Sequence, residues 1–225
     1  MKNKLNWLEG ALLLAPMVAL VVLWRELPER VPMHWNLRGE IDSWGSKPLL
    51  LFMPLTGLVV IGLLHFLPRI DPKLRRSTGG LGRMQNAIQM LRLALAAFFG
   101  AIFCIQCAVA LGHDLPVSRF IPLFLLLLLA VMGNYLSNLR PNYFAGIRTP
   151  WTLESPETWR ATHRLGGRLL FFGSVILLLL RFFVSESAFV RLFLTSVLLF
   201  AVWAVWYSWH HFHTQSATPL HASED

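Results

Sequence analysis

The segment FIPLFLLLLLAVMGNYL, residues 120–136, contains no charged side chain over its whole length. A stretch of about 20 mainly apolar residues is long enough to cross the hydrocarbon core of a bilayer as an α-helix. A helix satisfies its own backbone hydrogen bonds, which lipid tails cannot do. The segment therefore predicts a transmembrane helix, and it indicates that hydrocarbon surrounds this part of the chain.

Five more segments have a similar length and character. They cover residues 8–24, 49–67, 93–111, 169–184 and 188–207. The chain of 225 residues is 55% hydrophobic but only 14% charged, whereas soluble domains carry about a quarter charged residues. The sequence therefore predicts an all-α fold, a polytopic integral membrane helical bundle with six transmembrane helices.

The loops between these segments differ in basic charge. If the N-terminus is cytoplasmic, loops 68–84 and 137–168 and the tail are cytoplasmic too, and this set carries more Lys and Arg than the opposite set. Such an excess is typical of the cytoplasmic side. We therefore expect a multi-pass protein with both termini in the cytoplasm. The net charge of +8 lies mainly in these flanks, so we expect no direct contact with nucleic acid.

The predicted segments divide the chain into four parts. Residues 1–68 hold the first two helices and an extracytoplasmic loop, and residues 69–119 hold a basic cytoplasmic loop and the third helix. Residues 120–213 contain helices four to six with a second cytoplasmic loop. Residues 214–225 form a short polar tail that we expect to be disordered.

The first loop, residues 28–47, combines turn formers with aromatic side chains and charges of both signs. Pro, Asn and Gly favour turns, so the loop is expected to fold compactly. The candidate ligand-binding or partner-binding residues here are His34, Trp35, Asn36, Gly39, Asp42, Trp44 and Lys47. The alternative is a plain interfacial loop, anchored at the membrane surface by its tryptophans.

The second patterned region covers residues 134–164. Ser155 is expected to cap a helix that starts at Pro156 and runs into the fifth membrane segment. On that helix Trp159 and His163 are four residues apart and share a face. Arginines here suit phosphate or carboxylate recognition, although positive-inside charge is an equally simple explanation. The candidate residues are Asn134, Arg140, Asn142, Gly146, Arg148, Trp151, Trp159, His163 and Arg164.

Polar residues inside the membrane segments are few. His65, Gln89 and Arg92 are the candidates, because ionisable groups in lipid are functional candidates by default. Arg92 lies near a segment end, where it can instead extend to the interface. The histidines after the last helix lack the spacing of a metal pair on a helix, and we expect neither a metal nor a cofactor.

Motifs of known enzymes are absent from the sequence. Two acid–base pairs remain open, His34 with Asp42 in the first loop and Glu154 with His163 in the second. A lipid-head-group enzyme that uses His163 is one alternative, but we expect a protein without catalytic residues.

The second loop resembles the SdpI-type family of bacterial membrane proteins. The matching residues are Gly133, Asn134, Arg140, Asn142, Gly146, Arg148, Thr149, Pro150, Trp151, Thr152, Ser155, Trp159, Thr162, His163 and Arg164. The first loop resembles a short N-terminal domain of unknown function that is often fused to that family. Its matching residues are Pro32, His34, Trp35, Asn36, Gly39, Asp42, Trp44, Ser46 and Lys47.

The resemblance implies an immunity and signalling protein of the bacterial cytoplasmic (inner) membrane. By resemblance to the best-known member of the family, we expect resistance to a secreted toxic peptide and sequestration of a cytoplasmic transcriptional repressor. The sequence then suggests that the first loop meets the peptide and the second loop reports to a cytoplasmic partner. The alternative from another class is a small transporter or permease for an amphipathic molecule.

Overall fold

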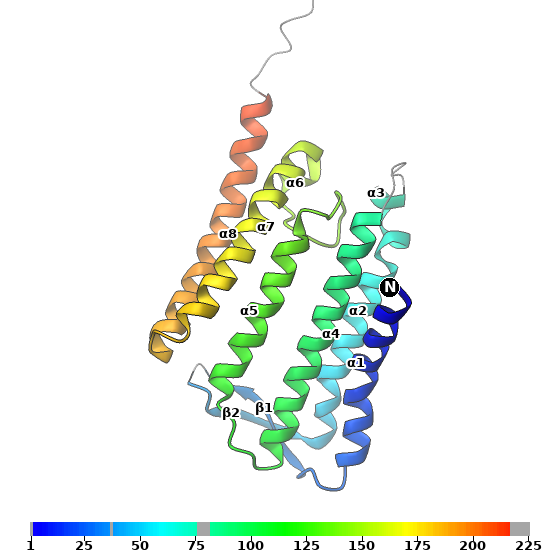
Figure 1. Cartoon of the computed structure of the whole chain (residues 1–225), viewed down its shortest axis with the longest axis vertical. Helices are drawn as coiled ribbons and strands as arrows, with labels where there is room; N and C mark the ends of the chain where they lie inside the picture. Colours follow the sequence, from blue (N-terminus) through cyan, green and yellow to red (C-terminus); the bar gives the residue numbers. More distant parts are fainter. Residues whose placement is uncertain (1, 37, 76–81, 217–225) are drawn as a thin grey trace, which may run out of the picture.

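The computed structural model describes residues 2–36, 38–75 and 82–216, and it is dominated by long helices (Figure 1). Six of these helices are long and apolar enough to cross a membrane, which confirms the predicted helical bundle. In chain order the elements are α1 (Lys2–Leu23), β1 (Arg30–Trp35), β2 (Ile41–Ser46), the 3-10 helix η1 (Lys47–Leu51), α2 (Phe52–Ile70), α3 (Pro72–Arg75), α4 (Gly82–Ala110), α5 (Val117–Leu136), α6 (Pro150–Glu154), α7 (Pro156–Leu180) and α8 (Glu186–Ser216).

Several membrane helices are longer than their apolar segments. The predicted third segment begins at residue 93, but α4 begins at Gly82, and α7 begins at Pro156 rather than at residue 169. At 1.5 Å per residue the 29 residues of α4 extend about 43 Å, which exceeds the hydrocarbon thickness of about 30 Å. These helices are therefore long enough to extend beyond the hydrocarbon core, and polar residues lie in their first turns.

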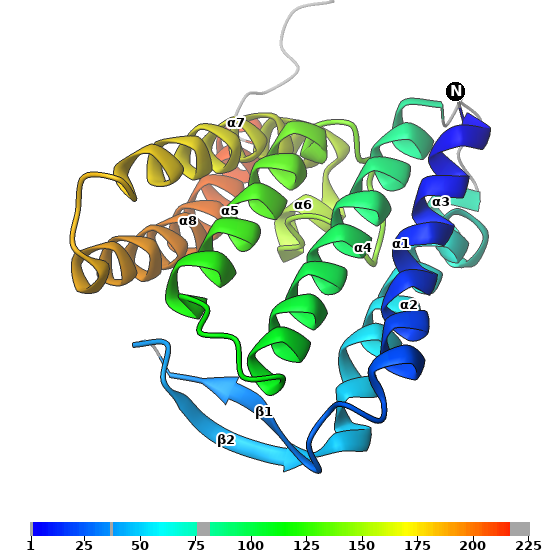
Figure 2. The same cartoon turned by 60° about the horizontal axis from the view of Figure 1, so that its bottom comes forward.

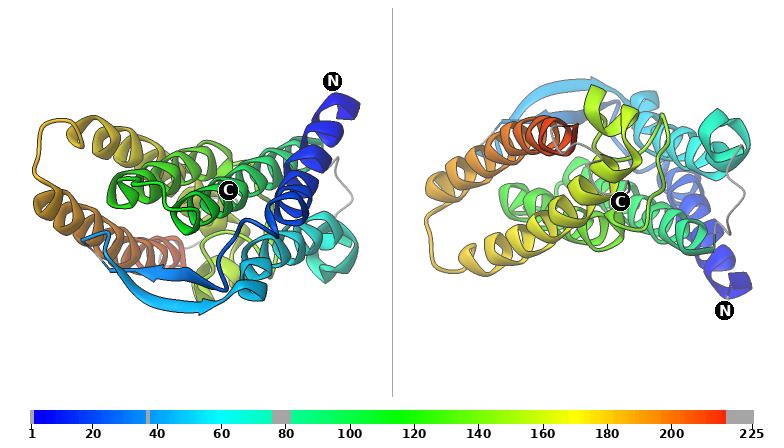
Figure 3. Two further views of the ribbon diagram at one scale, coloured as in Figure 1. Left: turned by 90° about the horizontal axis from the view of Figure 1, so that it is seen from below. Right: turned by 90° about the horizontal axis from the view of Figure 1, so that it is seen from above.

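The helices pack as two groups. One group is α1, α2 and α4, the other is α5, α7 and α8, and the contact between α4 and α5 joins them. Helix α4 contacts α1, α2 and α5, while α7 contacts both α5 and α8 (Figures 2 and 3). Small residues permit the closest approach: a Cβ added to Gly133 of α5 would lie 2.8 Å from the carbonyl oxygen of Gly167 in α7. Glycines of this kind bring membrane helices into direct backbone contact.

The loop between α1 and α2 forms an antiparallel β-hairpin, which the sequence did not predict. Its two strands, β1 and β2, pair with irregular register around Pro32 and His34. Neither strand alternates strictly between buried and exposed residues, so the pattern that identifies a strand in a sequence is missing. The hairpin is a small addition to an otherwise all-α bundle.

The hairpin and the loops around α6 lie at opposite ends of the bundle (Figure 1). We call the end that carries β1 and β2 the hairpin end, and the end that carries α3, α6 and residues 137–149 the loop end. Helix α1 starts and helix α8 ends at the loop end. Arg76 of the basic loop and residues 217–225 of the expected tail lie outside the described residues.

Candidate functional site

Asn142 organises the loop of residues 137–149 at the loop end. Its amide Nδ2 donates to the carbonyl oxygens of Arg140 (2.8 Å) and Ala145 (3.0 Å). Its Oδ1 accepts the backbone N–H groups of Phe144 (2.9 Å) and Ala145 (2.7 Å). The side chain is completely buried and uses all of its ordinary hydrogen-bonding capacity. Asn142 therefore closes the loop from within.

Asp71 holds the same loop from outside. Its buried carboxylate accepts the backbone N–H groups of Tyr143 (2.7 Å), Lys73 (2.8 Å) and Leu74 (3.1 Å). Asp71 was not among the candidate residues predicted from the sequence. The available signal was local, because Asp followed by Pro72 is a typical helix N-terminus, and Asp71 does cap α3.

Trp159 and His163 form the buried core beneath the loop. Their rings stack with centroids 3.9 Å apart, so the predicted shared face is confirmed. The indole Nε1 donates to the carbonyl oxygen of Leu139 (2.9 Å). His163 Nε2 accepts the backbone N–H of Ile147 (3.0 Å), and its Nδ1 donates to the carbonyl oxygen of Trp159 (2.9 Å). Both ring nitrogens are used, which fixes the imidazole in a neutral tautomer.

Glu154 does not join His163 in an acid–base pair. Glu154 is exposed at the end of α6, whereas His163 is fully buried. A catalytic base must reach the proton that it abstracts, and the two nitrogens of His163 are already hydrogen-bonded to the backbone.

Hydroxyl groups connect α6 to the last helix. Thr149 and Thr152 form a reciprocal capping box at the start of α6, and the Thr149 hydroxyl donates to Ser208 Oγ of α8 (2.9 Å). Ser155 accepts the backbone N–H of Thr158 (3.1 Å), which confirms the predicted cap of α7. The short helix α6 is thus tied to two transmembrane helices.

The remaining candidates of this region lie nearer the surface. Arg148 is exposed and donates from Nη1 to the carbonyl oxygen of Tyr143 (2.7 Å). Arg140 and Trp151 are half-buried. Asn134 and Arg164 are exposed and line a small hollow between α5 and α7. The predicted residues therefore separate into a buried set that shapes the loop and an outer set that is accessible.

The hairpin end brings His34 and Asp42 together. His34 Nδ1 lies 2.6 Å from Asp42 Oδ1, and both side chains are exposed. Asn36 stabilises the turn, since its Oδ1 accepts the backbone N–H groups of Arg38 (2.8 Å) and Glu40 (3.1 Å). Trp44 is half exposed on the outer surface, and Trp35 is half-buried.

Gly39 and Lys47, the other two candidate residues of the first loop, attach the hairpin to the bundle. Gly39 has a φ of +78°, and a Cβ there would lie 2.9 Å from Cβ of Ser118 at the start of α5. Lys47 is buried, with its Nζ 4.9 Å from the ring centre of Trp24 and 3.7 Å from Glu29 Oε1. Both residues support the hairpin rather than present its outer surface.

Helices α1, α2 and α4 share a polar cluster within the membrane span. Arg92 Nη2 lies 2.6 Å from Glu9 Oε2, and its Nη1 donates to His65 Nδ1 (3.0 Å). Gln89 Nε2 donates to Asn6 Oδ1 (2.9 Å). Glu9 was not predicted as a candidate, because no local sequence pattern indicates a partner 83 positions away. The expectation that Arg92 extends to the interface gives way to a helix-to-helix ion pair.

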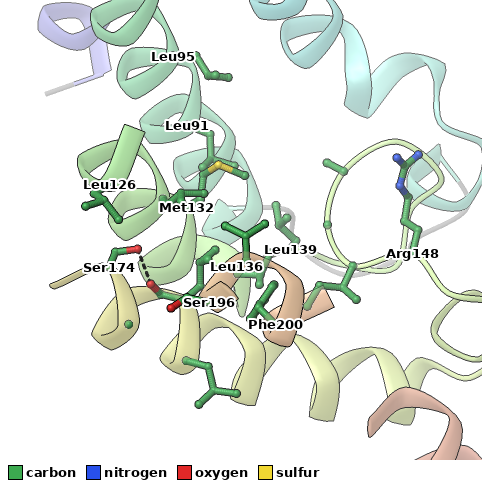
Figure 4. A pocket seen from close by; sticks show the side chains of 18 of the residues that line it. Leu91, Leu95, Leu126, Met132, Leu136, Leu139, Arg148, Ser174, Ser196 and Phe200 are labelled. Carbon is green, nitrogen blue, oxygen red and sulfur yellow. Dashed lines mark hydrogen bonds between the residues drawn. The ribbon is translucent and has the colours of Figure 1, made fainter. Parts of the chain in front are cut away.

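An apolar cavity of about 540 Å³ lies between the two groups of helices (Figure 4). Leu91 of α4, Met132 of α5 and Phe200 of α8 are among its lining residues, and Arg148 stands at its loop end. Its size falls in the range of small-molecule sites. Across the described ranges, no group of three His, Cys, Asp or Glu side chains could hold a metal ion.

These features define a class, a polytopic α-helical membrane protein with an ordered polar element at each end of its bundle. Residues 138–208 match the SdpI/YfhL protein family, and residues 11–58 match a domain of unknown function, DUF1648. The chain is 25% identical over 169 residues to the Immunity protein SdpI of Bacillus subtilis (strain 168), covering 74% of this chain and 76% of that relative. No solved structure matches the chain. The chain is therefore similar to the SdpI/YfhL family over residues 138–208 and to DUF1648 over residues 11–58.

Proposed function

We propose that this protein is an immunity and sensing protein of the bacterial cytoplasmic membrane. The observation that carries the proposal is the placement of two ordered polar elements, the hairpin and the 137–149 loop, at opposite ends of a membrane-spanning bundle. The similarity to a relative named an immunity protein supports it. The outer surface around His34 and Asp42 would meet a secreted toxic peptide, and the outer residues of the loop end would meet a cytoplasmic repressor.

The basic residues favour a cytoplasmic loop end. Lys73, Arg83, Arg140, Arg160 and Arg164 all belong to it, and Lys and Arg are concentrated on the cytoplasmic side of membrane proteins. With an even number of membrane spans, both chain ends would then lie on that side. The hairpin would face the compartment from which a secreted peptide arrives.

Helix α4 is the element that would couple the two ends. Near the hairpin, Gln106 Nε2 donates to the carbonyl oxygen of Pro32 (3.0 Å). Near the loop end, Met84 and Leu91 of the same helix pack in the core that contains Trp159. A peptide that binds one arrangement of α4 more tightly than another would shift the population of the loop end.

The proposed immunity role is tested by survival. The chain is expressed in cells that are sensitive to a secreted toxic peptide, and the cells are challenged with that peptide. We expect survival to rise with the wild-type chain and to fall again in the His34→Ala/Asp42→Ala variant at equal membrane abundance. Survival that never exceeds the empty-vector level would rule out the immunity role.

We also propose that the protein is not an enzyme, since His163 is engaged in two backbone hydrogen bonds.

The apolar cavity favours a second candidate function, a transporter of an amphipathic molecule. A Gly173→Phe change would fill the cavity, because Gly173 lines it and has open space at its Cβ position. Gly62→Phe is the matched control, since Gly62 also has open space but is outside the lining. Loss of substrate flux in proteoliposomes with Gly173→Phe alone would support transport.

A further inference from the structure

A second cavity, of about 680 Å³, lies at the loop end and is strongly basic. Four cationic side chains from four different segments line it: Lys73 of α3, Arg83 of α4, Arg140 of the loop and Arg160 of α7. Ser137 and Asn138 add polar groups. Within the described part of the chain, no Asp or Glu belongs to the lining.

Two of these cations, Arg160 and Lys73, have contacts that do not neutralise their charge. Arg160 Nη2 lies 2.6 Å from Glu157 Oε1, but both side chains are more than half exposed, and exposed pairs of this kind interact weakly. Lys73 donates to the carbonyl oxygen of Leu153 and lies 4.8 Å from the ring centre of Tyr143, contacts that leave its charge in place.

Two helix N-termini reinforce this charge. Arg83 is the second residue of α4, and Pro156, the first residue of α7, lines the cavity. The N-terminal end of a helix carries a partial positive charge that attracts anions. Cations and helix dipoles therefore act on the same space.

The depth of the cavity suggests the source of its ligand. Because α4 is longer than the hydrocarbon core is thick, its first turns lie at the level of the lipid head groups. Basic pockets between membrane helices at this depth suit lipid phosphates, and Arg binds phosphate oxygens with two parallel hydrogen bonds. We infer that this cavity binds a phosphate group, supplied by the head group of an anionic phospholipid. The lining residues alone support this site, which does not depend on the proposed immunity role.

The experiment uses the full chain in nanodiscs that contain equal amounts of phosphatidylglycerol and phosphatidylcholine with identical acyl chains. Native mass spectrometry then measures which lipid stays with the protein. The test variant is Arg83→Gln/Arg160→Gln, in which both changed side chains are exposed, so that folding is preserved. The control is Arg25→Gln/Arg191→Gln, which removes the same charge from exposed positions outside the cavity.

We expect the wild type and the control to retain phosphatidylglycerol preferentially, and the test variant to lose this preference by roughly tenfold or more. A second arm compares sodium phosphate with sodium chloride at equal ionic strength in phosphatidylcholine discs. A phosphate-dependent rise of the unfolding temperature that the test variant loses would support the phosphate site and assign its source to a soluble phosphate. Equal lipid preference in both double variants would overturn the site. Stabilisation by polyglutamate, with no effect of either phosphate source, would overturn it in favour of an acidic protein segment.

Discussion

Gly146 lies directly against the imidazole of His163. Its backbone has a φ of +110°, and a Cβ added there would collide with His163 Nε2. That same nitrogen accepts the N–H of Ile147, the next residue in the loop. The glycine therefore allows the loop to pass close enough to the ring for the hydrogen bond that fixes the imidazole.

Replacing Gly146 with Ala is expected to destabilise the loop end through both strain and collision. A residue forced into this backbone region costs about 1–3 kcal/mol, and the clash with His163 adds to it. Gly112→Ala is the control, because Gly112 has a φ of +89° but open space around its Cβ position. Thermal unfolding in detergent should show a larger loss for Gly146→Ala. Equal losses would mean that the contact with His163 contributes nothing.

Removal of the Asp71 carboxylate should loosen the loop and α3 together. Asp71→Ala leaves the N–H groups of Tyr143, Lys73 and Leu74 without their acceptor, and each unpaired buried donor costs about 1–3 kcal/mol. Hydrogen exchange should therefore accelerate at these amides. Asp114→Ala, at an exposed position near the start of α5, should leave them protected. Unchanged exchange in Asp71→Ala would contradict the role assigned to this carboxylate.

The ion pair between Glu9 and Arg92 is expected to show strong coupling. Arg92→Met leaves a buried carboxylate without its partner, at a cost of about 3–5 kcal/mol. The double variant Glu9→Gln/Arg92→Met removes the isolated charge and should recover most of that loss. A double-mutant cycle of unfolding free energies measures the coupling. Additive effects of the two single changes would show that the pair does not join α1 to α4.

Labelling of introduced cysteines tests the placement of the two ends across the membrane. In a background of Cys104→Ala/Cys107→Ala, the exposed positions Ser43 and Glu154 are changed to Cys one at a time. A membrane-impermeant maleimide added to intact cells should react at position 43 and reach position 154 only after lysis. Reaction at both positions in intact cells would exclude the sensor arrangement but leave the proposed phosphate site unaffected.

Local pattern was sufficient for some parts of the functional region. Ser155 and Pro156 predicted the start of α7, and the four-residue spacing of Trp159 and His163 predicted their shared face. It was insufficient for burial, because Asn142 resembles an ordinary polar loop residue in the sequence yet lies at the centre of the loop. Whether such a side chain meets a partner or the loop's own backbone depends on contacts that no local pattern specifies.

The sequence by itself determined that the chain forms six membrane-spanning helices, because long apolar runs in hydrocarbon have to satisfy their backbone hydrogen bonds internally. It also indicated the resemblance to the SdpI/YfhL family and to DUF1648, through the residues of its two patterned loops. Only the tertiary structure decided which polar groups pair: Glu9 with Arg92, Asp71 with Tyr143, and Thr149 with Ser208. These partners are 59 to 83 positions apart, and the packing of the helices brings them together.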